Sequence, residues 1–269
     1  MIVANLGAET VAVLGLGEAG SLLARDLVNG GAVVRGYDPD LHGDLTGIPL
    51  APTLAEAVAG ATLVLSVNWA SVALDVAREA LPHVGAGAIF ADLNTAGPAL
   101  KAELASIFAN SPATFVDVAM MAPVPPLGIR VPMFLAGDGA ERLAPILRRF
   151  GTPADIVGTV AGDAAARKLT RSVFFKGMSA AVWEALEAAR AAGVEDWLRD
   201  DIARTLSGAN AATLERIVDG TRNHARRRAH EMTDAAALLD QLGVPSTIAH
   251  ATAASLHRIV AEQGNQVPS

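Results

Sequence analysis

The fold is decided by a short stretch near the start of the chain, Val11-Ala12-Val13-Leu14-Gly15-Leu16-Gly17-Glu18-Ala19-Gly20. Its first four residues predict a buried strand, and the residues from Ser21 to Asn29 follow with helical periodicity. In such a turn the first glycine permits the tight bend, the second lets the backbone approach a pyrophosphate, and the third lets helix and strand pack closely. The stretch therefore predicts a dinucleotide-binding βαβ unit in which the residues from Gly15 to Gly20 contact the cofactor.

An acidic residue follows the second predicted strand, Val33 to Tyr37. This residue, Asp38, stands eighteen positions after Gly20, where a carboxylate can accept hydrogen bonds from an adenosine ribose. Its charge would repel a 2′-phosphate, and Pro39 stands where a phosphate-binding site often has Arg. Arg35 lies on the same strand but is expected to point elsewhere. These features predict NAD as the cofactor, with NADP as the alternative.

Short apolar runs alternate with helical stretches as far as about residue 156. The further predicted strands are Leu63 to Val67, Ile89 to Ala91, Phe115 to Val118 and Met133 to Ala136. Strands that alternate with helices form right-handed βαβ units around a parallel sheet. After Gly158 the pattern becomes helical. We therefore expect an α/β fold, a Rossmann-type doubly wound parallel sheet in residues 1–160, followed by a smaller all-α domain in residues 161–269 for substrate binding and dimerisation.

The composition excludes several classes of protein. The chain has 269 residues, of which 51% are hydrophobic, and its net charge is -7, so we expect a globular protein that does not bind nucleic acid. It has no Cys, which excludes disulfides and thiolate chemistry, and its histidines lack metal-ligand spacing, so no metal is expected. Neither a secretory signal nor a long apolar run is evident, which predicts a cytoplasmic protein without a membrane partner.

Lysine is rare in this chain. It occurs only at Lys101, Lys168 and Lys176, although Lys and Arg together number 21. Unlike Arg, a Lys can lose its proton, so a position that requires proton transfer requires Lys. Lys168, Ser172 and Lys176 fall on one face of the predicted helix that follows Gly162. Lys168 is thus either a solvated charge or a general acid or base that faces the cleft where the two domains meet.

Three motifs of the chain resemble the β-hydroxyacid dehydrogenases, a superfamily that includes 6-phosphogluconate dehydrogenase and 3-hydroxyisobutyrate dehydrogenase. They are the glycine turn, the segment Asp92-Leu93-Asn94-Thr95-Ala96-Gly97-Pro98, and the helix start from Gly162 to Lys168. The resemblance extends from Thr10 to about Glu262. It is greatest to a short, poorly characterised branch of the superfamily, with Met121-Ala122-Pro123-Val124-Pro125-Pro126 after the fifth strand.

This resemblance implies roles for the matching residues. It implies that Asn68 and Asn94 lie beside the cofactor and that Thr95 lies near the nicotinamide and the substrate. It also implies that Lys168 is the catalytic lysine, which exchanges a proton with the substrate hydroxyl during hydride transfer. Where family members usually have Asn, one turn after this lysine, the chain has Ser172, which we include in the catalytic site.

The segment expected to contact the substrate departs from the family. Many members carry Ser-Gly-Gly, which binds a substrate carboxylate, where this chain has Met121-Ala122-Pro123. Met121 is therefore expected at the substrate, and Arg130 could supply a charge-assisted contact to an anionic group. In the helical domain, His230-Glu231 stands about where relatives carry Lys-Asp. His230 is either a second proton carrier or anion contact, or part of an exposed basic helix face.

These motifs together predict an NAD(P)-dependent oxidoreductase. It would transfer a hydride between nicotinamide and a small hydroxy compound, with a 3-hydroxyacid favoured. One alternative is an imine reductase, although these relatives usually lack the catalytic lysine. Another alternative is a non-catalytic dinucleotide-binding protein on the same fold. A homodimer is also expected, because the Ala-rich helices leave apolar faces around Val182, Trp183 and Leu186, and because the relatives dimerise through this domain.

Overall fold

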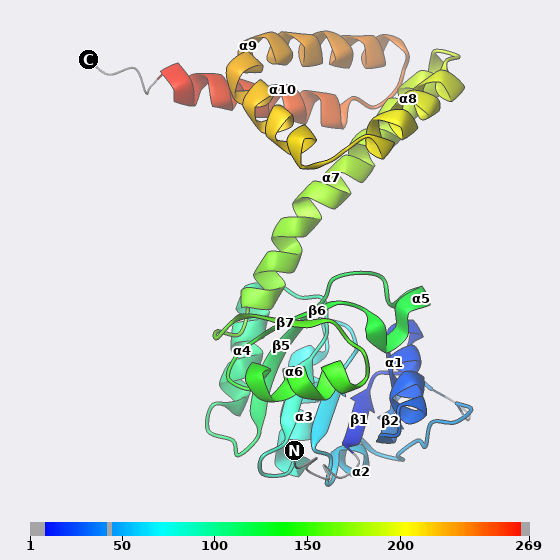
Figure 1. The fold of residues 1–269 in the computed structure, drawn as a ribbon, viewed down its shortest axis with the longest axis vertical. Coiled ribbons are helices and arrows are strands. Elements are labelled where there is room, and N and C mark those ends of the chain that lie inside the picture. The colour runs from blue at the N-terminus through cyan, green and yellow to red at the C-terminus, as the bar shows by residue number, and fades with distance from the viewer. Residues whose placement is uncertain (1–8, 42–44, 265–269) are drawn as a thin grey trace. The chain divides into compact units, whose positions relative to one another are not determined.

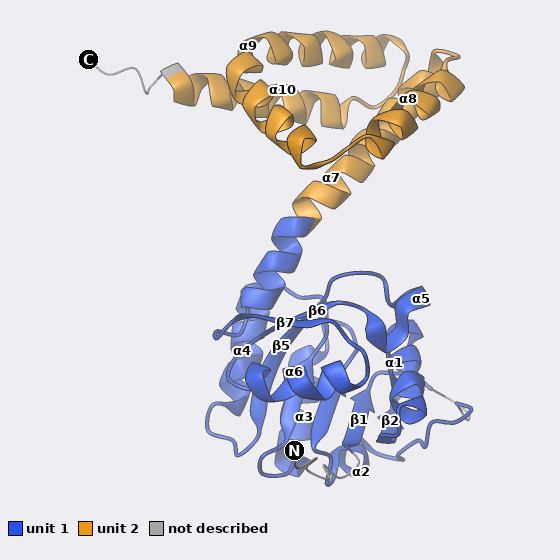
Figure 2. Cartoon of the chain, in the orientation of Figure 1, with its two compact units in different colours: residues 1–171 blue, residues 172–269 orange. Residues whose placement is uncertain are grey.

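The computed structural model describes residues 9–41 and 45–264. The chain divides into two compact units, residues 1–171 and residues 172–269 (Figure 2). This division falls inside a long helix, α7 (Asp163–Ala191), which begins three residues after the predicted boundary at residue 160. The prediction that the start of the chain carries no secretory signal falls largely on residues 1–8, which lie outside the described residues.

The first unit is built on a seven-stranded sheet with the order β2-β1-β3-β4-β5-β6-β7 (Figure 1). Its strands are β1 (Thr10–Leu14), β2 (Val33–Tyr37), β3 (Leu63–Ser66), β4 (Ile89–Asp92), β5 (Thr114–Met120), β6 (Met133–Ala136) and β7 (Ala154–Gly158). All neighbouring strands are parallel except β5 and β6. The predicted Rossmann-type sheet is confirmed. The antiparallel direction of β6 and the edge strand β7 are features that the sequence pattern did not predict.

Helices cover both faces of this sheet. They are α1 (Glu18–Asn29), α2 (Leu54–Val58), α3 (Ala73–Ala80), α4 (Pro98–Phe108) and α6 (Ala140–Arg149), with the short segments η1 (Leu81–His83), α5 (Val124–Leu127) and η2 (Gly128–Arg130). Val11 and Val13 of β1 pack in one core with α1 and α6, whereas Ala12 and Leu14 pack in a second core with α2, α3 and α4. A strand buried on both faces needs apolar residues at every position, which explains the uninterrupted apolar runs of the sequence.

The described residues of the second unit form helices that are joined by short loops. The end of α7 is followed by α8 (Glu195–Ser207), α9 (Ala211–Gln241) and α10 (Thr247–Gly264). Helices α9 and α10 pack against each other, and α9 bends at His224, whose backbone departs from helical geometry. Glu184 of α7 accepts hydrogen bonds from the backbone N–H groups of Ile248 (2.7 Å) and Ala249 (2.8 Å), at the start of α10. The predicted all-α C-terminal region is confirmed.

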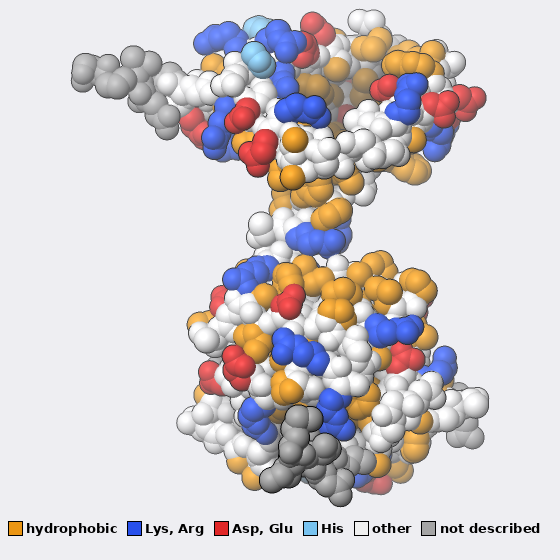
Figure 3. All heavy atoms as spheres, in the orientation of Figure 1, with side chains coloured by type: hydrophobic (Ala, Val, Ile, Leu, Met, Phe, Trp, Pro, Cys, Tyr) orange, Lys and Arg blue, Asp and Glu red, His pale blue; other side chains and the backbone are white. Residues whose placement is uncertain are grey.

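Large apolar side chains are exposed on the second unit. Trp183 is 64% exposed and Trp197 is 63% exposed, whereas Val182 and Leu186 of the same predicted apolar face are half-buried. Figure 3 shows hydrophobic side chains at the surface of this unit in the view drawn. None of the described helices has the length and hydropathy that a membrane span requires.

Candidate cofactor and active site

The glycine turn joins β1 to α1 at the carboxyl edge of the sheet. Gly15 has a φ of +95°, and a Cβ atom on it would collide with the carbonyl oxygen of Val67. A Cβ atom on Gly20 would collide with the carbonyl oxygen of Gly15, so the close approach of α1 to the turn requires glycine there. Gly17 differs from both, because a Cβ atom on it would meet no atom within 4 Å. The open space beside Gly17 is therefore accessible to a ligand.

The first turn of α1 adjoins this open space. Gly17 precedes the helix, and no side chain caps its N-terminus, so the first backbone N–H groups lack intrahelical partners. Such groups, together with the helix dipole, favour an anion. Leu16 is buried against Gly36, whereas Glu18 is exposed and Ala19 is half-buried. The turn thus fits a pyrophosphate, which would occupy the space that a side chain on Gly17 would fill.

Asp38 follows β2 and is bound to the glycine turn. Its Oδ2 accepts a hydrogen bond of 2.7 Å from the backbone N–H of Leu16, and its Oδ1 accepts one of 3.0 Å from the N–H of Asp40. A carboxylate has about four acceptor sites, so Asp38 can also accept hydrogen bonds from a ribose. Arg35 instead donates to the carbonyl oxygens of Glu56 and Ala59, both at 2.8 Å, near the end of α2. Arg35 therefore points elsewhere, as expected.

A hollow of about 350 Å³ lies beside Asp38. It is lined by Gly36, Tyr37, Asp38, Pro39, Leu41, Leu50, Ala51 and Pro52. Its walls combine apolar side chains with polar surface that includes the carboxylate of Asp38, and such walls suit the ring and the ribose of adenosine. The glycine turn and this hollow are connected through the Asp38–Leu16 hydrogen bond, so they provide neighbouring surfaces for pyrophosphate and adenosine.

Two asparagines meet at the ends of β3 and β4. Asn94, which is 4% exposed, accepts a hydrogen bond of 2.5 Å from the backbone N–H of Asn68 and donates one of 2.8 Å to Asn68 Oδ1. The amide of Asn68 donates to the hydroxyl of Ser66 at 3.2 Å. The predicted cofactor residues Asn68 and Asn94 are therefore brought together. Because the carboxyl ends of parallel strands share one edge, they lie at the same edge as the glycine turn.

Lys168 lies in the second turn of α7 and reaches the loop after β4. Its Nζ donates a hydrogen bond of 2.9 Å to Oγ1 of Thr95, although 73 positions separate the two residues in sequence. Three positions further along the helix, Arg171 donates to the carbonyl oxygen of Met121 at 3.0 Å. The start of α7 thus brings the predicted catalytic Lys168 to the predicted substrate residue Thr95, and it brings Arg171 to Met121.

Beneath this edge lies a buried ionic cluster that the sequence motifs did not predict. Lys101 is 1% exposed, and its Nζ lies 2.7 Å from Asp92 Oδ2 and 3.0 Å from Asp117 Oδ1. Both aspartates are completely buried. Asp117 Oδ2 also accepts hydrogen bonds of 3.0 Å from the N–H groups of Gly162 and Ala165, at the start of α7. The cluster therefore connects α4, the end of β4, the middle of β5 and the start of α7.

The charges of this cluster do not cancel. Two carboxylates face one ammonium, and the N-terminus of α7, whose N–H groups donate to Asp117, supplies partial positive charge to that carboxylate. Burial raises the pKa of Asp92 above its ordinary value, and the ammonium of Lys101 opposes this rise. In the sequence, the only signal for Lys101 was the scarcity of lysine. A cation that is buried between two carboxylates does not contribute to solubility, so the reason for a lysine at this position lies in the cluster.

The remaining predicted residues have other neighbours. Ser172 is half-buried and follows Lys168 by one helical turn in α7. Arg130 ends η2, where the N–H of the preceding Ile129 donates to Asp26 of α1 at 2.9 Å. This places Arg130 near α1. His230 is exposed on α9 in the second unit. The roles of Ser172, Arg130 and His230 stay predictions. No group of His, Asp and Glu side chains suited to a metal ion occurs among the described residues.

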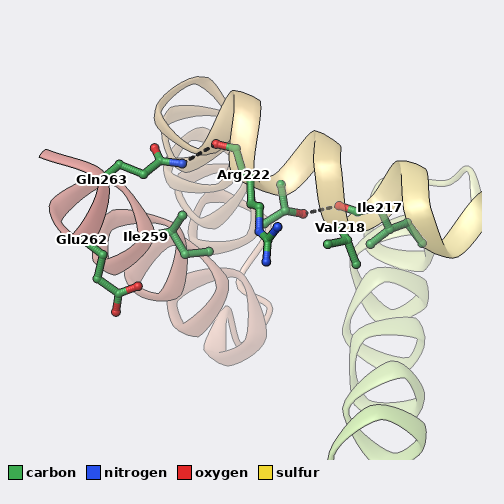
Figure 4. A pocket seen from close by; sticks show the side chains of 7 residues that line it. Ile217, Val218, Arg222, Ile259, Glu262 and Gln263 are labelled. Carbon is green, nitrogen blue, oxygen red and sulfur yellow. Dashed lines mark hydrogen bonds between the residues drawn. The ribbon is translucent and has the colours of Figure 1, made fainter. Parts of the chain in front are cut away.

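A separate cavity of about 670 Å³ lies in the second unit, between α9 and α10 (Figure 4). Its lining consists of Ile217, Val218, Thr221, Arg222, Ile259, Glu262 and Gln263. Gln263 donates a hydrogen bond of 2.8 Å to the carbonyl oxygen of Arg222, which joins the two helices at its side. Ile217 is 56% exposed, so the cavity opens onto apolar surface. None of the residues predicted to act in the site lines it.

Comparison with protein families gives separate matches for the N-terminal and C-terminal parts of the chain. Residues 10–124 match the NAD binding domain of 6-phosphogluconate dehydrogenase, and residues 189–259 match a domain of unknown function (DUF1932). The first match contains the glycine turn, Asp38, Asn68 and Asn94. The prediction that this region is a nicotinamide dinucleotide-binding domain is confirmed.

Solved structures are similar over nearly the whole chain. A conserved hypothetical protein from Sinorhizobium meliloti 1021 has 32% identity, covering 98% of this chain and 93% of that one, with a TM-score of 0.63. The conserved protein MTH1747, described as structurally similar to 3-hydroxyacid dehydrogenases, has 27% identity, covering 94% and 98%, with a TM-score of 0.60.

Imine reductases share the fold. The enzyme from Myxococcus stipitatus in complex with NADP+ has 20% identity, covering 94% of each chain, with a TM-score of 0.77. Its V8 variant in complex with NAD+ has 21% identity, covering 95% of each chain, with a TM-score of 0.78. Four observations indicate the same superfamily: the sheet, the glycine turn, the dinucleotide-binding match and the full-length similarity. The chain belongs to the superfamily of β-hydroxyacid dehydrogenases and 6-phosphogluconate dehydrogenase-like proteins.

Proposed function

We propose that the protein is an NAD(P)-dependent oxidoreductase that interconverts a small hydroxy compound, most favourably a 3-hydroxyacid, and its carbonyl form. The hydrogen bond from Lys168 to Thr95 carries this proposal. It holds an amine at the loop after β4, on the sheet edge that also carries the glycine turn. A dehydrogenase needs such a group, because the oxygen of the substrate must lose or gain a proton while its carbon exchanges a hydride.

The bound nicotinamide supplies the hydride chemistry, and the chain supplies binding, orientation and proton transfer. The glycine turn and the start of α1 would hold the pyrophosphate, and Asp38 would hold the ribose. Lys168 would take the proton from the substrate hydroxyl at its Nζ during oxidation and return it during reduction. Thr95, which accepts from that Nζ, would keep the amine directed at the substrate oxygen.

We further propose that NAD is preferred over NADP. The carboxylate of Asp38 is held at the end of β2 by the N–H groups of Leu16 and Asp40, beside the hollow that suits adenosine. A 2′-phosphate at this position would meet a negative charge. The nearby guanidinium of Arg35 is bound to the carbonyl oxygens at the end of α2, so it is not directed to the phosphate.

Imine reduction is the alternative activity, and the similarity of the fold to imine reductases supports its inclusion in any test. The two activities can be separated with a panel of hydroxyacids, simple alcohols, amines and cyclic imines. Each compound is assayed with each cofactor by the absorbance of the nicotinamide. We expect turnover with a hydroxy compound that depends on Lys168. Turnover of imines alone would favour the reductase, and cofactor binding without any turnover would favour a non-catalytic protein.

The proposed assembly is a homodimer formed through the second unit. The exposed Trp183 and Trp197 support it, because large apolar side chains that are exposed on a surface can mark a site of protein–protein interaction. Closed two-fold pairing is the commonest way in which chains cover such surfaces. The proposed ligands are otherwise small molecules, namely the dinucleotide and the hydroxy compound.

A further inference from the structure

A closed ring of contacts passes through the buried ionic cluster and the proposed catalytic lysine. In one direction, Lys168 bonds Thr95, and the neighbouring Asn94 donates to Asp92 Oδ1 at 2.6 Å. Asp92 Oδ2 then bonds Lys101 at 2.7 Å. This side of the ring therefore links Thr95, through Asn94 and Asp92, to the buried ammonium of Lys101.

The other side of the ring runs through α7. Lys101 Nζ lies 3.0 Å from Asp117 Oδ1, and Asp117 Oδ2 accepts from Gly162 and Ala165. Lys168 stands three positions after Ala165 on the same helix. The carboxylate of Asp117 thus fixes the start of the helix that carries Lys168, while Asp92 fixes the loop that carries Thr95.

Lys101 is the group that joins these two sides. Without its ammonium, two buried carboxylates would face each other without a counter-ion, and burial already raises the pKa of Asp92. Breaking a buried ion pair by removing one partner leaves an uncompensated charge, so the two carboxylates would move apart or bind protons. Either change would alter the positions of Asn94 and of the first turn of α7.

We propose that Lys101 is a positioning residue for proton transfer: by bridging Asp92 and Asp117 it sets where the amine of Lys168 lies relative to Thr95 and the Asn68–Asn94 pair. The proposal rests on the proposed role of Lys168. Lys101 touches neither cofactor nor substrate, and it acts through the loop after β4 and the start of α7. Its loss lowers turnover more than cofactor affinity, because the glycine turn and Asp38 lie outside the ring and Asn94 is the one proposed cofactor residue within it.

The test uses two variants that cut the ring on either side of Lys101. Asp117→Asn weakens the link to α7, and Asp92→Asn weakens the link to Asn94. Each leaves one ammonium with one carboxylate, so the buried charges cancel and the protein is expected to fold. Glu184→Gln is the matched control, since Glu184 is also a buried carboxylate that accepts two N–H groups at a helix start, but in the second unit.

The first readout needs no substrate. The chain has three lysines, so protein labelled with 13C and 15N lysine gives three side-chain NMR signals, which Lys168→Met and Lys176→Met assign. We expect Asp117→Asn and Asp92→Asn to move the signal of Lys168 toward that of the exposed Lys176, while Glu184→Gln leaves it in place. An unchanged Lys168 signal in both ring variants would overturn the proposal.

The second readout separates turnover from binding. In both ring variants kcat is expected to fall about 10- to 100-fold, since displacing a reacting group by about 1 Å can cost that much. In Asp117→Asn, whose link to α7 does not include Asn94, the Kd for NADH is expected to change less than about twofold. A fall of the same size in Glu184→Gln would assign the effect to stability alone and overturn the proposal. If Lys168→Met keeps full turnover, the proposed function fails, whereas the NMR result still decides whether Lys101 positions Lys168.

Discussion

The carboxylate of Asp38 accepts a hydrogen bond of 2.7 Å from the backbone N–H of Leu16, so the acid after β2 also fixes the turn after β1. These two residues are 22 positions apart. One side chain therefore contributes to two neighbouring parts of the dinucleotide site. It shapes the turn that faces the pyrophosphate, and it places a negative charge beside the hollow that suits adenosine.

Asp38→Ala is expected to weaken NAD binding and to narrow the difference in affinity between NAD and NADP. The variant loses a hydrogen bond to a charged group, roughly 1.5 to 3 kcal/mol, and it loses the repulsion toward a 2′-phosphate. Titration calorimetry with both cofactors measures the two changes. Asp40→Ala is the control, because Asp40 is exposed and contacts Asp38 through its backbone. Equal affinities for NAD and NADP in the unsubstituted protein would show that a residue other than Asp38 determines the cofactor preference.

Two glycines of the turn are expected to respond differently to a side chain. Gly17→Val should fold normally but weaken NAD binding by about tenfold or more, or at least about 1.4 kcal/mol, because its side chain enters space that is otherwise open. Gly20→Val should lower the melting temperature, because its Cβ collides with the backbone of Gly15. Differential scanning fluorimetry and NADH fluorescence titration distinguish the two effects. Normal NAD binding in Gly17→Val would show that the pyrophosphate does not bind at this turn.

Lys168→Met is expected to keep cofactor affinity and to lower turnover by roughly 100- to 10,000-fold, the usual contribution of a positioned acid or base. Lys168→Arg should lose nearly as much, because Arg does not release its proton at neutral pH. Lys176→Met is the matched control, since Lys176 stands two turns, about 12 Å, further along α7. Steady-state kinetics on a substrate found in the panel decide between them. Loss of turnover in Lys176→Met with retention in Lys168→Met would assign the chemistry to the other lysine.

Sedimentation velocity at micromolar concentration is expected to show a homodimer. Trp183→Glu should shift the protein toward monomer, because an unpaired charge would have to be buried in the contact. Trp69→Glu controls for the general effect of replacing an exposed Trp, since Trp69 is 81% exposed but lies in the first unit. A monomer for the unsubstituted protein, or an unchanged dimer for Trp183→Glu, would contradict the proposed contact.

The sequence was sufficient to predict the features that depend on local patterns. The glycine turn, the direction of Arg35 and the long helix after Gly162 each follow from residue spacing within one or two elements. The direction of β6 was not predictable, because the alternation of side chains is the same in parallel and antiparallel strands. The dimer, the cytoplasmic location and the substrate stay predictions.

The buried cluster illustrates what spacing cannot reveal. Lys101, Asp92 and Asp117 lie on α4, β4 and β5, and they meet because the register of the two strands places Asp92 beside Asp117. That register depends on the packing of the whole sheet. In the sequence, Asp92 begins one of the family motifs and Lys101 is one of three lysines, but nothing in either pattern indicates that they meet Asp117.

Helix α7 begins in one unit and ends in the other, and this bears on how such proteins can diversify. The contacts of Lys168 and Asp117 assign the first two turns of α7 to the dinucleotide-binding unit, whereas the matched domain of unknown function begins only at residue 189. A recombination point after Arg171 would exchange the C-terminal helices and leave the proposed proton donor in place. Chimeras joined there would take the dinucleotide-binding unit and Lys168 from one parent, and the end of α7 and the C-terminal helices from the other.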